Sequence, residues 1–232
     1  MMPTPTRTAS AVATVAAITI GQSPRPDIVD EITPLLPPHV RVVEMGALDG
    51  LEPAEIAALR PGPDDHTLVS RLRSGEEVLV GKERILPRVQ ACIDALQDAA
   101  SLIVILCTGP FPPLRSRRPI VYPERLLLHL VRAVSPGAHV GVLTPAAAQI
   151  PHQVERWGAV AGAVTVRAYS PYAGREGVEE ACAAFAAAGV DLVVLDCLGY
   201  TLALKDTVRR LVGRPTVLAR TLLARAVAEL LE

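Results

Sequence analysis

The stretch LVVLDCLGY, residues 192–200, joins a run of apolar residues to a cysteine and a glycine turn. A continuous apolar run of this length is typical of a strand that is covered on both faces in a parallel sheet. A second stretch, LIVILCTG at residues 102–109, has the same design and lies 90 positions earlier in the chain. The pair predicts two equivalent buried strands that each end at a cysteine.

The same shift also aligns Ala91-Cys92 with Ala181-Cys182, so the four cysteines form two equivalent pairs. Six of the 19 positions aligned from residue 91 to residue 109 are identical, which indicates a duplicated unit. Two copies are too few to stack as a repeat array. The duplication therefore predicts two related half-domains.

Strand and helix patterns alternate along the whole chain, which predicts an α/β fold with a parallel sheet in each half and a cleft between the halves. We expect a disordered tail at residues 1–11. The first half is expected over residues 12–117, completed by a C-terminal helix at 219–232, and the second half over 118–218. A hairpin is expected at residues 68–80, either flanking the cleft or as a surface excursion.

The first strand, residues 12–20, leads into the turn Gly21-Gln22-Ser23-Pro24-Arg25. Ser23 is a favourable N-cap and Pro24 suits a first helical position, which predicts a helix over residues 24–36. Such a turn at the carboxyl end of a strand can bind an anion, with Arg25 adding positive charge. The alternative is an ordinary capped turn with a solvated Arg25.

Composition excludes several classes of protein. A chain of 232 residues with 50% hydrophobic content and a net charge of −1 has a large core and no basic surface for nucleic acid. Four cysteines without metal-ligand spacing indicate reduced thiols, and no apolar run is long enough to span a membrane. We expect a cytoplasmic protein without metal or cofactor that binds a small carboxylate or carbonyl compound, as a possible homodimer. Five histidines are dispersed without metal-ligand spacing: His39, His66, His129, His139 and His152.

The two strand-end cysteines, Cys107 and Cys197, place a thiol on each wall of the cleft. One thiolate could then remove a proton from one face of a carbon atom while the other thiol returns a proton to the opposite face. The turn N–H groups that follow each cysteine are expected to lower the thiol pKa and to hold a carboxylate or enolate. A buried strand cysteine is more often structural, but the duplication favours a site. Cys92 and Cys182 lie on apolar helix faces, which predicts inert thiols with raised pKa.

Four motifs resemble the AroM family: TIGQSPRPD at residues 19–27, Cys-Thr-Gly at 107–109, GVLTP at 141–145 and LDCLGY at 195–200. More distantly, the chain is similar to the aspartate/glutamate/hydantoin racemase superfamily. That resemblance implies two facing α/β halves, an Asp/Glu racemase-like fold and cofactor-independent chemistry by paired cysteines.

Carried over by the resemblance, the catalytic pair is Cys107 and Cys197, and the carboxylate-holding turn positions are Thr108, Gly109, Leu198 and Gly199. Amino-acid racemases usually have Cys-Asn-Thr and Cys-Thr at these places, whereas this chain has Cys-Thr-Gly and Cys-Leu-Gly. An amino-acid substrate is therefore not implied. The remaining candidates for substrate contact are Gly21, Gln22, Ser23, Arg25, Thr144, Pro145 and Tyr200.

Two residues close to Cys197 in the sequence, Tyr200 and Asp196, each allow more than one role. Tyr200 could close over a ligand or cap the following helix. Asp196 should point away from the cysteine face because side chains alternate along a strand, which predicts a structural carboxylate. The sequence as a whole predicts a cofactor-independent racemase or isomerase. The alternatives are an isomerase or decarboxylase that uses a single cysteine, or a non-catalytic ligand-binding or regulatory protein.

Overall fold

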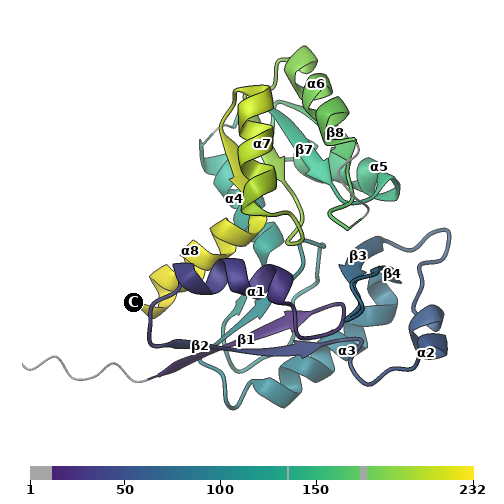
Figure 1. Cartoon of the computed structure of the whole chain (residues 1–232), viewed down its shortest axis with the longest axis vertical. Helices are drawn as coiled ribbons and strands as arrows, with labels where there is room; N and C mark the ends of the chain where they lie inside the picture. The colour runs from purple at the N-terminus through teal and green to yellow at the C-terminus, as the bar shows by residue number, and fades with distance from the viewer. Residues whose placement is uncertain (1–11, 135, 173–176) are drawn as a thin grey trace, which may run out of the picture.

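The computed structural model describes residues 12–134, 136–172 and 177–232, which form two α/β halves stacked one above the other (Figure 1). The tail expected at residues 1–11 lies outside the described residues. Up to residue 134 the elements are β1 (Ala13–Thr19), α1 (Pro26–Ile32), η1 (Thr33–Leu35), β2 (Val40–Gly46), α2 (Pro53–Ala58), β3 (Thr67–Arg71), β4 (Glu77–Gly81), α3 (Lys82–Leu96), β5 (Leu102–Ile105), β6 (Ile120–Val121) and α4 (Pro123–Val134). Later elements are β7 (His139–Thr144), η2 (Ala147–Gln149), α5 (Ile150–Gly158), β8 (Ala163–Ala168), α6 (Val178–Ala188), β9 (Leu192–Leu195), α7 (Leu202–Val212), β10 (Thr216–Leu218) and α8 (Ala219–Leu231).

A four-stranded parallel sheet forms the centre of each half. The strand order is β2-β1-β5-β6 in the first sheet and β8-β7-β9-β10 in the second, so the two sheets have the same topology. Every residue of β5 and β9 is buried, as the continuous apolar runs predict. The predicted α/β fold with two pseudo-symmetric parallel-sheet halves is confirmed.

The division between the two sheets falls later in the chain than the sequence suggested. β6 lies in the range 118–218 that is expected to form the second half, but it pairs with β5 of the first sheet. The Ile103 N–H donates to the Pro119 carbonyl at 3.0 Å, and the Val193 N–H donates to the Pro215 carbonyl at 2.9 Å. β6 and β10 are therefore equivalent fourth strands, and the first sheet extends beyond residue 117.

The C-terminal helix α8 returns to the first half and lies beside α1 (Figure 1). Its residues Leu223, Ala224 and Val227 are buried in the cluster that contains Val15 and Val104 of the first sheet. The last helix thus covers a face of the first sheet that would otherwise contact water. None of the helices in the described ranges has the length and apolarity needed to cross a bilayer.

The turn after β1 differs from its prediction. Helix α1 begins at Pro26 with Arg25 at the N-cap position and without a side-chain cap, so Ser23 is not the N-cap. Ser23 instead donates its N–H to the Asp49 carboxylate at 2.9 Å, and its hydroxyl also donates to Asp49. The helix ends at Ile32 and continues as the short η1, because Pro34 lacks the N–H that a longer α-helix would use.

The expected hairpin is present as the antiparallel pair β3 and β4, and the turn after β1 holds it against the first sheet. The Gln22 N–H donates to the Arg71 carbonyl at 3.2 Å, and the Arg73 guanidinium donates to the Ser23 carbonyl. A Cβ atom at Gly21 would lie 2.4 Å from the Arg71 carbonyl oxygen, so only glycine permits this approach. The turn therefore positions the hairpin.

The substitution Leu223→Ala should lower the free energy of unfolding by about 2–5 kcal/mol, because it opens a cavity between α8 and the first sheet. Leu223 is 1% exposed, whereas Leu230 on the same helix is 61% exposed. Leu230→Ala is the matched control and should change stability by less than about 0.5 kcal/mol. Urea unfolding measures both, and equal losses would show that α8 does not complete the first half.

Candidate active site

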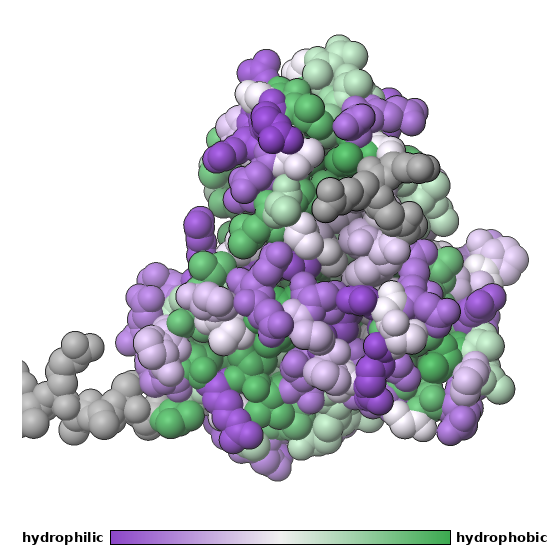
Figure 2. All heavy atoms as spheres, in the orientation of Figure 1, coloured by the Kyte–Doolittle hydropathy of each residue, from purple (hydrophilic) through white to green (hydrophobic). Residues whose placement is uncertain are grey.

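Cys107 and Cys197 line one small cavity between the two halves. Each sulfur accepts a hydrogen bond from a glycine N–H two residues later: Gly109 to Cys107 at 3.3 Å, and Gly199 to Cys197 at 3.3 Å. The duplicated sequence therefore becomes a duplicated local geometry on opposite walls. On the face of the molecule shown in Figure 2, hydrophilic side chains gather where the two halves meet.

An arginine holds the peptide group between the first and second residues after each cysteine. Arg156 on α5 donates to the Thr108 carbonyl at 2.9 Å, and Arg220 on α8 donates to the Leu198 carbonyl at 2.7 Å. The N–H of each of these peptide groups is the one that donates to the cysteine sulfur. Each arginine thus orients and polarises a peptide dipole whose positive end faces a thiol.

Two further backbone donors lie in the same turns. Within the described ranges, neither the Thr108 N–H nor the Leu198 N–H donates to a protein group. The Thr108 hydroxyl donates to the Asp196 carbonyl at 3.0 Å and so ties the first turn to the second. Unpaired N–H groups beside a cavity are suited to hold a carboxylate or an enolate oxygen.

Burial has the largest effect on the pKa of both thiols, and it favours the neutral form. It raises the pKa of Cys107 to about 12 and that of Cys197 to about 11, although the glycine N–H groups act in the opposite direction. The sequence-based expectation of a lowered pKa is therefore wrong, because one hydrogen bond does not offset the loss of hydration of a thiolate. Arg25 and Arg220 also lower the pKa of Cys197, whereas Arg156 does so for Cys107.

The other two cysteines are buried in helices and do not line the cavity. Burial raises the pKa of Cys92 to about 11, and burial also raises the pKa of Cys182. Both shifts have the predicted direction.

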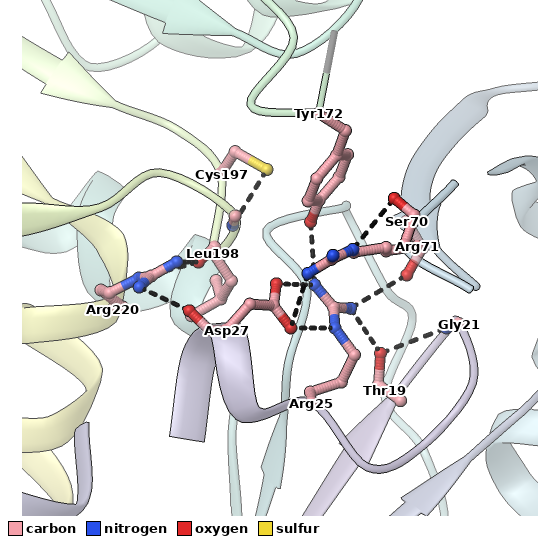
Figure 3. Close-up of polar contacts among 12 residues, drawn as sticks. Thr19, Gly21, Arg25, Asp27, Ser70, Arg71, Tyr172, Cys197, Leu198 and Arg220 are labelled. Atoms are coloured by element: carbon pink, nitrogen blue, oxygen red, sulfur yellow. Dashed lines mark hydrogen bonds and ion pairs between the residues drawn. The ribbon is translucent and has the colours of Figure 1, made fainter. Parts of the chain in front are cut away.

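Arg25 is 2% exposed and all five of its N–H groups donate to protein acceptors (Figure 3). Two of these bonds reach the Asp27 carboxylate, at 2.9 and 2.8 Å. The others reach the hydroxyl groups of Thr19, Ser70 and Tyr172, at 3.1, 3.3 and 2.9 Å. Arg25 is therefore neither solvated nor available to pair directly with a substrate carboxylate.

Besides Arg25 and Asp27, the ion pair of Arg156 and Asp196 borders the cavity. Asp196 is fully buried and accepts from the Arg156 guanidinium and from the Trp157 indole, the latter at 3.1 Å. Its other carboxylate oxygen and the Arg156 Nε have no partner in the described part of the chain. The sequence predicted that Asp196 points away from the cysteine face, whereas the residue lines the same cavity as both cysteines.

Eight of the predicted site residues line the cavity: Arg25, Cys107, Thr108, Gly109, Pro145, Cys197, Leu198 and Gly199. Five do not: Gly21, Gln22, Ser23, Thr144 and Tyr200. Thr144 lies behind the cavity wall, where its hydroxyl donates to Gln149 at 2.7 Å. Tyr200 is fully buried and its hydroxyl donates to the Tyr169 carbonyl at 2.6 Å, so its side chain stabilises the second half.

Several cavity residues have no signal in the sequence. Ser70 and Leu68 come from the hairpin, Tyr172 follows β8, and Gln149 and Arg156 come from the helices after β7. A serine on a strand or an arginine on an amphipathic helix normally contacts water. Only the packing of the two halves turns these side chains inward.

His66, at the start of the hairpin, lines the cavity and lies 4.6 Å from the His152 ring of the second half, measured between ring centroids. Burial, His152, Lys82 and Arg156 lower the pKa of His66 to about 4. The histidine is therefore neutral at pH 7. Among the described residues, no group of three or more His, Cys, Asp or Glu side chains could hold a metal ion.

The two parallel α/β halves with a shared cavity between them form an Asp/Glu racemase-like fold. The chain belongs to the AroM family, since the model described as AroM protein matches residues 15–231. No curated protein matches the chain.

Solved structures with this fold have low sequence identity to the chain. Allantoin racemase from Klebsiella pneumoniae gives a TM-score of 0.63 at 16% identity, over 94% of this chain and 87% of that one. Unliganded arylmalonate decarboxylase gives 0.60 at 18% identity, over 94% and 92%. The maleate isomerase Iso from Pseudomonas putida S16 gives 0.61 at 15% identity, over 94% and 92%. At these identities the likeness establishes the fold.

The lowered pKa of His66 predicts that the protein loses stability as pH falls from about 6.5 to about 4, because the unfolded chain binds a proton that the folded chain does not. His66→Asn should lose less stability over this range than the wild type. Thermal or urea unfolding at pH 8 and pH 5 tests this difference. Parallel losses in the two proteins would contradict it.

Proposed function

We propose that this protein is a cofactor-independent racemase or isomerase for a small carboxylate or carbonyl compound, with Cys107 and Cys197 as its acid/base pair. The observation that carries the proposal is the matched pair of cysteines in one cavity, each accepting a glycine N–H at 3.3 Å. Racemases, an isomerase and a decarboxylase with the same fold support this reaction class.

In the proposed reaction, one cysteine thiolate removes the proton from the substrate α-carbon, and the C–H electron pair moves onto the carboxylate or carbonyl oxygen. The unpaired N–H groups of Thr108 and Leu198 would stabilise this enolate oxygen. The opposite thiol then gives its proton to the other face of the carbon and becomes the thiolate. The two cysteines have exchanged roles, and the same steps run in reverse.

The raised thiol pKa values are compatible with this chemistry. A pKa of about 11 leaves about one Cys197 thiol in ten thousand ionised at pH 7, which limits the rate. The thiolate that does form is a stronger base than an ordinary one, as removal of a proton from carbon requires.

A second candidate is a reaction that uses Cys197 alone as the acid, as in decarboxylation, where a C–C bond breaks, carbon dioxide leaves and the carbanion takes the thiol proton. The unequal surroundings of the two cysteines favour this alternative. Arg25 and Arg220 lower the pKa of Cys197, whereas Cys107 has the higher pKa of the two.

Incubation in D₂O with the enantiomers of allantoin, aspartate and glutamate, and with maleate and an arylmalonate, tests the reaction class. Racemisation with deuterium at the α-carbon should be lost by at least about 10³-fold in both Cys107→Ala and Cys197→Ala, because each removes one acid/base group. Cys92→Ala is the control, since Cys92 is buried outside the cavity. Activity that survives either cavity substitution rejects the two-base reaction, and activity lost only in Cys197→Ala favours the single-cysteine alternative.

Alkylation by iodoacetamide, followed at each cysteine by peptide mapping, should accelerate about tenfold per pH unit between about pH 7 and about pH 9 at Cys197, because only the thiolate reacts. Cys107 should be the slower of the two because its pKa of about 12 is higher than the value of about 11 for Cys197. A rate that reaches a plateau below pH 9 at either site would contradict the raised pKa.

A further inference from the structure

The Tyr172 hydroxyl has an unusual position among the polar groups of the cavity. It accepts a hydrogen bond from the Arg25 guanidinium at 2.9 Å, although Tyr172 belongs to the second half and Arg25 to the first. Within the described ranges this hydroxyl donates to no protein group. Its own proton is therefore available to a molecule in the cavity.

The hydroxyl lies beside the turn that carries Cys197. A Cβ atom at Gly199 would be 2.5 Å from the Tyr172 oxygen, so the phenol rests directly on the Gly199 backbone. The Cys197 sulfur points toward the Tyr172 side chain (Figure 3). A ligand oxygen that approaches the Leu198 N–H would thus meet the phenol as a second donor.

Contacts between the two halves fix the Tyr172 loop in place. The Ser170 hydroxyl donates to the Glu77 carboxylate on β4, and the Tyr172 N–H donates to the Ser170 hydroxyl at 3.1 Å. Arg25 holds the phenol from the other side, and its charge polarises the O–H bond. Burial raises the pKa of Tyr172, which keeps the hydroxyl protonated and able to donate.

We propose that the Tyr172 hydroxyl, polarised by Arg25, donates a hydrogen bond to the substrate oxyanion beside Cys197 and is a further catalytic residue. The inference rests on the proposed function and deepens it, because it assigns the anionic end of the substrate to the Cys197 wall. Arg25 acts through the phenol as a positioning residue, since all of its N–H groups already have protein acceptors.

Two alkylating agents of nearly equal size test this donor without knowledge of the substrate. Iodoacetate carries a carboxylate and iodoacetamide does not, so the ratio of their rates at Cys197 reports anion binding beside the thiolate. A hydrogen bond to a charged group is stronger than one between neutral groups, so Tyr172→Phe should lower this ratio by about tenfold or more. Tyr200→Phe is the matched control, because Tyr200 donates to the Tyr169 carbonyl outside the cavity and should leave the ratio within about twofold of wild type.

An unchanged ratio in Tyr172→Phe, or an equal fall in Tyr200→Phe, would overturn the inference. A change confined to the thiol pKa alters both rates by the same factor, leaves the ratio unchanged and also counts against it. If Tyr172→Phe does not fold, Tyr172→Met provides the same test, since methionine fills irregular apolar space.

The outcome is independent of the proposed reaction. A lowered ratio without deuterium exchange on any substrate would uphold the donor and reject the racemase. Exchange that requires both cysteines, together with an unchanged ratio, would uphold the racemase and reject the donor.

Discussion

The site depends on two peptide groups that are each held at both ends. The carbonyl oxygen of Thr108 accepts from Arg156 and that of Leu198 accepts from Arg220, while the N–H on the other side of each peptide group donates to a cysteine sulfur. Both cysteine turns follow strands that are buried on both faces of their sheets. Helices cover such strands on both sides, so polar groups of the site lie at the strand ends. The geometry of the cavity thus depends both on the buried strands and on the helices that supply the two arginines.

Desolvation opposes the hydrogen bonds at these sulfurs, and desolvation prevails. Both thiols have a raised pKa despite a glycine N–H and at least one nearby arginine. A fully buried anion loses most of its hydration, and a single N–H replaces only a small part of it. The cavity therefore holds two neutral thiols at pH 7, and any thiolate is a minority species.

Elements whose pattern lies within a short stretch of residues could be predicted from the sequence. The apolar runs before Cys107 and Cys197, their equivalence at a spacing of 90 residues and the hairpin after β2 all appear in the structure. Contacts that form only when the halves pack together could not be predicted. Tyr172 is 147 residues from Arg25 and His152 lies on the opposite half from His66, so no local pattern connects them. The same long-range burial reverses the expected sign of the thiol pKa shifts.

The two walls of the cavity are equivalent in their backbone and unequal in their side chains. The Cys197 wall has the phenol of Tyr172, which the ion-paired Arg25 holds, whereas the Cys107 wall has the ion pair of Arg156 and Asp196. A racemase needs equivalent proton donors for its two enantiomers, but it needs only one site for the carboxylate, because that group stays in place while the proton changes faces. The difference between the walls is thus what a fixed anion site beside paired acid/base groups requires. It also explains how one duplicated fold can support either two-base or single-cysteine chemistry.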